Sequence, residues 1–163
     1  MGEPYFAQDR SEMLSPEQIM GMSGLDFIRG MVEGRLPAPP ICRAMNYTVF
    51  SADEGRVVFR GTPEFEHMNP IGSVHGGWFG TLLDSCMACA VQTKLPQGTA
   101  YTTLEYRVNI IRGIVPDGRQ YDAIGDVDHV GRRTAVAHGA LRGVEDGKLY
   151  ATGSTTCLLM SGG

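Results

Sequence analysis

The sequence predicts an α+β fold in which one curved antiparallel β-sheet wraps around a single long helix. Two observations predict it. The apolar stretch from residue 77 to about residue 93 is the only long helix-like segment in the last hundred residues of the chain, and its apolar residues cover several faces. A helix that is apolar all round must be buried. The rest of that region reads as strands joined by short turns, which favours antiparallel pairing.

Residues 1–40 are predicted to form an N-terminal helical extension. The polar residues 1–15 are expected to be frayed. A serine, a proline and a glutamate at 15–17 have the residue types typical of a helix start. Apolar residues then follow in roughly helical spacing as far as Met31. This pattern leaves two alternatives, because two glycines interrupt it: one helix or two short ones. The stretch LPAPPI is expected to end helical structure.

Residues 41–163 are predicted to form the main domain. The segment CRAMNYTVFSADEGRVVFRGT, residues 42–62, reads as two strands joined by a turn at Asp53–Gly55. Four strand-like segments follow the central helix, at residues 101–113, 119–131, 132–147 and 148–160. A single bent sheet that buries one helix is the hotdog architecture.

Composition excludes several classes of protein. The chain has 163 residues, which suffices for one domain with a core, and a net charge of −4, which does not favour nucleic-acid binding. We expect no membrane span and no signal peptide, because no apolar run reaches the necessary length and the first residues have mixed charge. Four cysteines are too few for a disulfide scaffold. A reduced, cytoplasmic protein without a cofactor is the expectation.

One acidic residue, Asp84, lies inside the apolar central helix. A buried, unpaired carboxylate would cost several kcal/mol. Two explanations remain. Asp84 is either a structural residue bonded to a nearby serine or arginine, or a catalytic carboxylate with a perturbed pKa in a half-buried cleft.

Gly76 and Gly77 stand where the central helix is expected to begin. The first N–H groups of a helix lack internal partners, and glycine lets a ligand oxygen come close to them, as in an oxyanion hole. A tight turn would explain the pair equally well. Gly77 and Asp84 are seven residues apart, roughly 10 Å along a helix, too far to act on one atom. Two antiparallel copies of the helix would solve this, so we expect a site shared between two subunits.

The segment HMNPIGSVHGGWFGTLLDSCM resembles the signature of the hotdog-fold acyl-CoA thioesterases of the phenylacetic-acid-pathway (PaaI-like) group. The pattern is H-x-N-x-x-G-x-x-H-G-G, then six residues and an aspartate. The matching positions here are His67, Asn69, Gly72, His75, Gly76, Gly77 and Asp84. The later segments GRRTAVAHGALR and GKLYATGSTTCLL also resemble strands of the family, so the likeness covers about residues 41–160.

This resemblance implies a role for each matching residue. Asp84 would be the nucleophile or the general base, and sequence does not separate the two. Gly76 would donate its N–H to the thioester oxygen. Asn69 would position the thioester or the attacking water, and His75 would hydrogen-bond in the site. A strand hydroxyl that orients the water corresponds to Thr103, with Thr102 as the alternative if the register slips by one residue.

Substrate contacts outside this core are weaker inferences. Arg132 and Arg133, in a turn, are candidates for the phosphates of coenzyme A, or else are two solvated turn residues. Arg112 is a further candidate, although the family often has Arg-Pro here and this chain has Arg-Gly. Trp78 would line the acyl pocket or fill the core. The N-terminal extension would cover one end of the acyl tunnel or pad an oligomer.

Other chemistry is less well supported. Cys86 and Cys89 form a C-x-x-C pair, but inside a helix they read as small packing residues rather than a redox motif. The spacing of His67, His75 and Asp84 fits no zinc pattern, and no metal is expected. The leading function is thus hydrolysis of an aryl- or short- to medium-chain acyl-CoA by a homodimer or a homotetramer built as a dimer of dimers. The alternatives are a hotdog hydratase or dehydratase and a non-catalytic acyl-CoA-binding protein.

Overall fold

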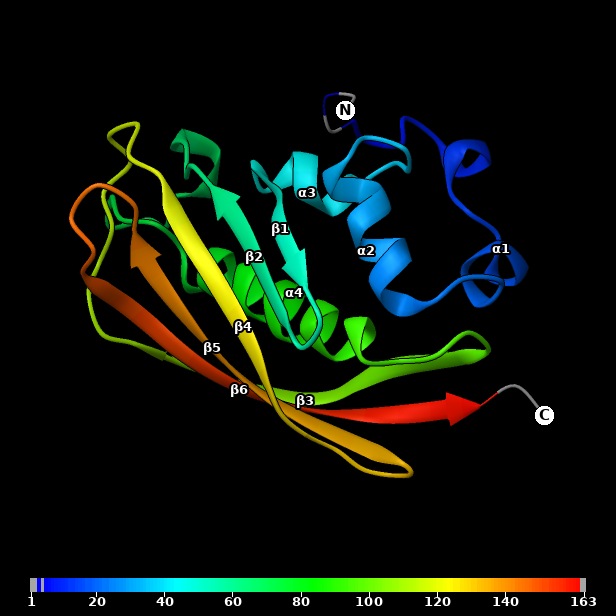
Figure 1. The fold of residues 1–163 in the computed structure, drawn as a ribbon. Helices are drawn as coiled ribbons and strands as arrows, with labels where there is room; N and C mark the ends of the chain where they lie inside the picture. Colours follow the sequence, from blue (N-terminus) through cyan, green and yellow to red (C-terminus); the bar gives the residue numbers. More distant parts are fainter. Residues whose placement is uncertain (1–2, 4, 162–163) are drawn as a thin grey trace.

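The computed structural model describes residue 3 and residues 5–161. One antiparallel sheet curves around the long helix α4, and the short helices α1 and α2 lie near the C-terminal end of that helix (Figure 1). The strands are β1 (Tyr47–Asp53), β2 (Arg56–Gly61), β3 (Thr99–Ile110), β4 (Tyr121–Val130), β5 (Thr134–Gly143) and β6 (Leu149–Ser161). The helices are α1 (Pro16–Met20), α2 (Gly24–Val32), α3 (Pro40–Ala44) and α4 (Gly76–Thr93), with 3₁₀ turns at Arg10–Glu12 and Phe65–His67. The predicted hotdog fold is confirmed.

The sheet holds six strands in the order β1-β2-β4-β5-β6-β3, and every neighbouring pair is antiparallel. Three glycines, Gly125, Gly139 and Gly153, lie side by side on β4, β5 and β6. A Cβ atom at Gly139 would lie 2.9 Å from Cγ of Met87 on α4, and one at Gly125 would collide with the helix backbone. Because these positions have no side chains, α4 can lie directly on the sheet.

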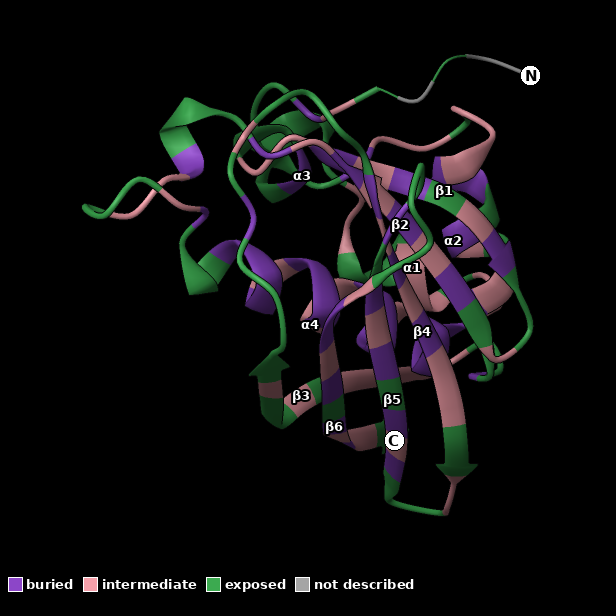
Figure 2. Cartoon of the chain, turned by 90° about the vertical axis from the view of Figure 1, so that its left-hand side faces the viewer, coloured by how far each residue is buried: buried purple, intermediate pink, exposed green. Residues whose placement is uncertain are grey.

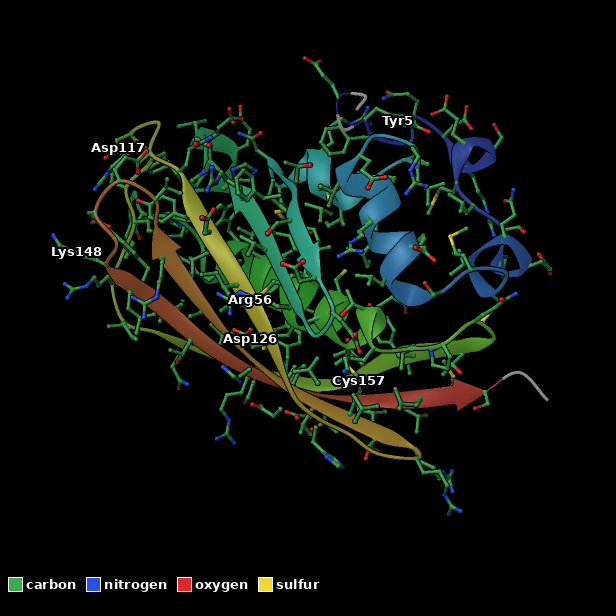
Figure 3. All side chains as sticks on the ribbon, viewed as in Figure 1. Tyr5, Arg56, Asp117, Asp126, Lys148 and Cys157 are labelled. Carbon is green, nitrogen blue, oxygen red and sulfur yellow. The ribbon has the colours of Figure 1, made fainter. Side chains whose placement is uncertain are left out.

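Helix α4 is the centre of the core. Twelve of its eighteen residues are buried, as the apolar stretch predicts. On the sheet, Cys157 of β6 (labelled in Figure 3) belongs to the same core and is fully buried. None of the described helices has the length and apolar character needed to cross a membrane.

The N-terminal extension is a fixed part of the molecule. Residues 1–15 were expected to be frayed, and this is wrong for the described part. Ala7 is 1% exposed, and its backbone N–H donates to the carbonyl oxygen of Ala38 at 3.1 Å. Of the two alternatives for the next segment, two short helices is correct. Ser15 caps α1 through a capping box with Gln18, and Ser23 caps α2.

The expectation after LPAPPI was partly wrong. Residues 42–44 were predicted to open a strand, but they belong to α3, and β1 begins only at Tyr47. Pro40 stands at the first position of α3, where a proline costs no hydrogen bond and its fixed φ suits the helix. The division of the chain at residue 40 into extension and domain stays a prediction.

Strand β3 forms one edge of the sheet, next to β6. None of its residues is buried, and Figure 2 shows it in the colours of intermediate and exposed residues. A bulge at Leu104 shifts its register, so Thr103 pairs with Cys157 while Glu105 pairs with Thr156. Tyr106 and Ile110 lie on the α4 side of the strand, yet they stay 48% and 49% exposed. The sheet thus ends in an apolar edge that nothing in the described chain covers.

Candidate active site

Asp84 and Thr103 meet between α4 and β3. The hydroxyl Oγ1 of Thr103 donates a hydrogen bond of 3.2 Å to Oδ1 of Asp84. Among the described residues, no cation pairs with this carboxylate, and no serine or arginine bonds it as the structural explanation requires. Burial raises the pKa of Asp84 above its ordinary value, and the bond from Thr103 partly opposes that rise. Thr102 is exposed, so Thr103 and not the alternative Thr102 is the strand hydroxyl that faces Asp84.

The start of α4 distinguishes its two glycines. His75 is the N-cap, and its Nδ1 accepts the N–H of Gly77 at 2.8 Å. The N–H of Gly77 is therefore already engaged. The N–H of Gly76 has no acceptor within the described part of the chain, and Gly76 is exposed. Gly76, rather than Gly77, is the free donor that can bind an oxyanion.

A tight loop fixes the approach to the helix. Asn69 Oδ1 accepts the N–H groups of Ile71 and Ser73, and its Nδ2 donates to Ser73 Oγ at 2.8 Å. Gly72 has φ +84°, a conformation that favours glycine. The asparagine and glycine of the motif thus shape the loop that carries His75. Ser73 was not singled out from the sequence, because a lone serine in a turn gives no signal.

His67 is a structural residue. It is buried, its Nδ1 accepts the N–H of Glu64 at 2.9 Å, and its Nε2 lies 3.0 Å from the carbonyl oxygen of Ala44. Accepting at Nδ1 and donating at Nε2 describes a neutral ring with both nitrogens engaged. No cluster of three His, Cys, Asp or Glu side chains suited to a metal ion occurs among the described residues.

The structure divides the motif into two groups. One group is Asp84 with Thr103, near the middle of α4. The other is Asn69, His75 and Gly76 at the start of the helix. Eight residues separate Gly76 from Asp84, which is about 12 Å along a helix axis. Within one chain, no single atom of a substrate can touch both groups.

The three candidate arginines also lie apart. Arg133 is at the end of the sheet where its carbonyl accepts the N–H of Leu159, and Arg132 precedes it in the turn. Arg112 is at the opposite end, where its N–H bonds the carbonyl of Tyr150 at 3.1 Å. All three are exposed, and none takes part in a salt bridge among the described residues.

Trp78 belongs to the core. It is 1% exposed, its indole N–H donates to the carbonyl of Met45 at 2.9 Å, and its ring packs edge-on against Phe79 and Tyr121. Tyr101, which the sequence analysis did not single out, lies near the catalytic pair on β3. It stands two residues before Thr103 on the same face of β3, and its partial burial follows the strand's alternation.

Comparison with known proteins agrees with the fold. The sequence model of the thioesterase superfamily matches residues 71–150, whereas comparison with curated proteins gives no significant match. A point mutant of the phenylacetic acid degradation protein PaaI from Thermus thermophilus is 27% identical, with a TM-score of 0.66, over 73% of this chain and 97% of that one. A phenylacetic acid degradation-related protein from Ralstonia eutropha is 25% identical, with a TM-score of 0.72, over 81% and 98%.

A third structure carries a ligand. It is a hypothetical thioesterase from Streptococcus pneumoniae solved with coenzyme A, 24% identical with a TM-score of 0.64, covering 71% of this chain and 90% of that one. At this identity it supports the fold alone. The matched region holds the start of α4, Asp84 and Thr103. Residues 71–150 therefore match the thioesterase superfamily, and the chain resembles the PaaI-like proteins with the hotdog fold.

Proposed function

We propose that the protein is an acyl-CoA thioesterase that hydrolyses the thioester to a free acid and coenzyme A. The observation that carries the proposal is the half-buried Asp84 carboxylate, which has a raised pKa, one hydrogen bond from Thr103 and no counterion among the described residues. A raised pKa makes the carboxylate a better proton acceptor near neutral pH. Thioester hydrolysis needs such a base or nucleophile, a positioned water and an oxyanion donor.

We further propose that two subunits build each site. Gly76 lies beside Ile110, whose Cδ1 would be 3.4 Å from a Cβ on that glycine, so the helix start is next to the C-terminal end of β3. Asp84 meets the N-terminal half of β3 at Thr103. If two copies pair their β3 edges antiparallel around an axis near Tyr106, the C-terminal half of one strand meets the N-terminal half of the other. Gly76 of one copy then approaches Asp84 of the second.

The exposed apolar residues of β3 support this pairing. Leu104, Tyr106 and Ile110 are 57%, 48% and 49% exposed on an edge strand with unpaired backbone groups. Such an edge is a template for association with another strand. The same pairing would bring Arg112 of one copy toward Arg132 and Arg133 of the other, where the three would face the phosphates of coenzyme A. Two such dimers forming a tetramer is part of the expectation.

Within the shared site each group has one task. The N–H of Gly76 would stabilise the oxyanion of the tetrahedral intermediate. Asn69 uses one N–H of its amide on Ser73, which leaves the other to orient the thioester or the water. Thr103 would hold the carboxylate and the water in line. Asp84 would take a proton from the water or attack the carbonyl carbon itself.

The alternatives fit the geometry less well. A hydratase needs a histidine and an acid in one site, but His75 Nδ1 is committed to the N–H of Gly77 as a helix cap. A binding protein would not need a carboxylate with a raised pKa beside its ligand. A cytoplasmic location is part of the proposal, and all four cysteines are free thiols, which suits a reducing compartment.

The test is hydrolysis of phenylacetyl-, benzoyl-, butyryl- and octanoyl-CoA, followed as release of coenzyme A. Asp84→Asn should lose about a hundredfold or more in kcat, since general acid–base effects alone reach that size. Asp53→Asn is the matched control, because its side chain is 76% exposed at the end of β1. Tight binding of these thioesters without turnover would favour the binding protein instead, and hydration of crotonyl-CoA would favour a hydratase.

A single turnover in heavy-oxygen water identifies Asp84 as the nucleophile if the label enters its side chain. If the carboxylate attacks the thioester, water later opens a mixed anhydride, and one heavy oxygen enters either the acid or the Asp84 side chain. If the carboxylate is a base, the label enters only the released acid. Mass spectrometry of the peptide that contains Asp84 reads the difference.

A further inference from the structure

An apolar cavity lies between the N-terminal extension and the main domain. Its volume is about 220 Å³. Nine of its eleven lining residues come from the extension, among them Leu14, Ile19, Phe27 and Met31, and the other two are Cys89 of α4 and Tyr101 of β3. Figure 1 shows α1 and α2 above the first residues of β3 and beside the end of α4. The extension therefore does more than cap the sheet, because it supplies most of the wall of a chamber.

The chamber is next to the catalytic pair. Tyr101 lies two residues before Thr103 on the same face of β3, which places it about 7 Å along the strand. The charge of Asp84 adds to burial in raising the pKa values of both Tyr101 and Cys89, so both groups lie within electrostatic reach of the carboxylate. Tyr101 and Cys89 thus place one wall of the chamber near the carbonyl position that the proposed function assigns to Asp84.

The walls are held in place before any ligand binds. The N–H of Gly24 donates to the carbonyl of Leu95 at 3.0 Å, and the N–H of Gly98 donates to the carbonyl of Met20 at 3.0 Å. These bonds fix both ends of the segment between α1 and α2 to the loop that joins α4 to β3. Ile28 of α2 is 1% exposed in the main core. A preformed chamber can discriminate between ligands by size.

Resting on the proposed function, we propose that this chamber binds the acyl group and selects uncharged, apolar acyl groups about as large as one aromatic ring or a chain of six to eight carbons. No lining residue carries a charge, so a second carboxylate on the acyl group would be buried without a partner. An apolar cavity of about 150 Å³ is large enough for benzene, and this one exceeds that size. Leu14 and Phe27 are specificity-determining residues that touch the acyl group.

The experiment measures kcat/KM for acetyl-, butyryl-, hexanoyl-, octanoyl-, phenylacetyl- and succinyl-CoA. Leu14→Trp fills the chamber and should lower the octanoyl-to-acetyl ratio of kcat/KM at least tenfold, since each methylene in an apolar pocket is worth about tenfold or more. Phe27→Ala enlarges it and should move the optimum to longer chains. Wild type should prefer hexanoyl- over succinyl-CoA at least tenfold.

Leu25→Ala is the matched control, because Leu25 is a partly buried residue of α2 that does not line the cavity. It should leave the chain-length preference as in wild type. If Leu14→Trp and Phe27→Ala keep the wild-type preference, or if Leu25→Ala changes it equally, the chamber does not select the substrate. The hydrolase proposal would survive that result.

A binding measurement separates the two proposals. Thioether analogues of the same acyl-CoA series cannot be hydrolysed, and their Kd in wild type should fall as the chain lengthens to eight carbons. Leu14→Trp should abolish this trend. If wild type hydrolyses none of the thioesters but its Kd still falls with chain length, the hydrolase proposal is wrong and the proposed binding of acyl groups in the chamber is supported. If Kd does not change with chain length, the chamber does not bind the acyl group.

Discussion

The hydroxyl of Thr103 donates a hydrogen bond of 3.2 Å to Oδ1 of Asp84. Thr103 lies on β3, the edge strand of the sheet next to β6. Burial raises the pKa of this carboxylate, and the hydrogen bond from Thr103 lowers it. The two effects set the pH above which Asp84 is ionised and able to accept a proton. The strand residue therefore tunes the helix residue as well as orienting it.

Replacing Thr103 should change the pH profile of the reaction. Thr103→Val removes the donor, so the pKa of Asp84 should rise further and the acidic limb of kcat should move to higher pH. The maximal rate should also fall about tenfold as the carboxylate loses its orientation. Thr103→Ser keeps the hydroxyl and should restore both. Thr102→Val, on the exposed face, is the control, and a shift there of the same size would contradict the assignment of Thr103.

Asp84 should lower the stability of the fold at neutral pH. Its pKa is raised in the folded state above the ordinary 3.8, so the folded chain binds more protons than the unfolded chain between the two values. Stability therefore falls as pH rises through that window. Asp84→Asn should raise Tm at pH 7 relative to wild type, and the gain should shrink as pH is lowered toward 4.

A matched substitution at Asp122 should change Tm in the opposite direction. Asp122→Asn removes an ion pair in which Arg60 Nε lies 2.7 Å from Asp122 Oδ1 between β2 and β4. It should lower Tm at pH 7, so a general effect of removing negative charge is distinguishable. A lower Tm for Asp84→Asn at pH 7 would mean that the carboxylate stabilises the fold and is a structural residue.

The two glycines at the helix start should respond differently to alanine. A Cβ at Gly76 would lie 3.4 Å from Ile110 Cδ1, an ordinary contact, whereas one at Gly77 would lie 3.0 Å from His75 Nδ1. Gly76→Ala should thus keep or slightly raise Tm, because alanine favours helix, yet lower kcat at least tenfold by keeping the oxyanion from the N–H. Gly77→Ala should disturb the cap, lower the free energy of unfolding by roughly 1 kcal/mol and so lower Tm. Equal activity in Gly76→Ala and wild type would remove the glycine from the site.

Much of the fold could be predicted because the signals are local. The apolar stretch of α4 and the strand patterns around it specify a helix inside an antiparallel sheet, whichever strand order is chosen. The row Gly125, Gly139 and Gly153 could not be predicted, since only the register of the three strands aligns these glycines. The sequence also did not predict that Ala7 has a fixed place in the structure, because its hydrogen-bond partner Ala38 is distant in sequence.

The candidate site shows the same limit. Asp84 could be singled out because a lone charge in an apolar helix conflicts with its surroundings. The family resemblance gave Thr103, with Thr102 as the alternative if the register slips, and only the contact with Asp84 selects Thr103. The distinction between Gly76 and Gly77 depends on the direction of the His75 ring, which no sequence pattern contains. Tyr101 and the chamber depend on how the extension folds back, which is a long-range property.

The sharing of the site between two subunits can be tested by mixing inactive chains. If Gly76 and Asp84 of one site come from different copies, a dimer of one Asp84→Asn chain and one Gly76→Ala chain has one intact site and one doubly altered site. Equimolar chains refolded together should then recover roughly a quarter of wild-type activity, since half of the dimers are mixed and each has one good site. If both residues of a site come from the same chain, each site carries one substitution and no activity returns. The two variants assayed separately, each refolded alone, provide the baseline, and recovery no greater than their average would contradict the shared site.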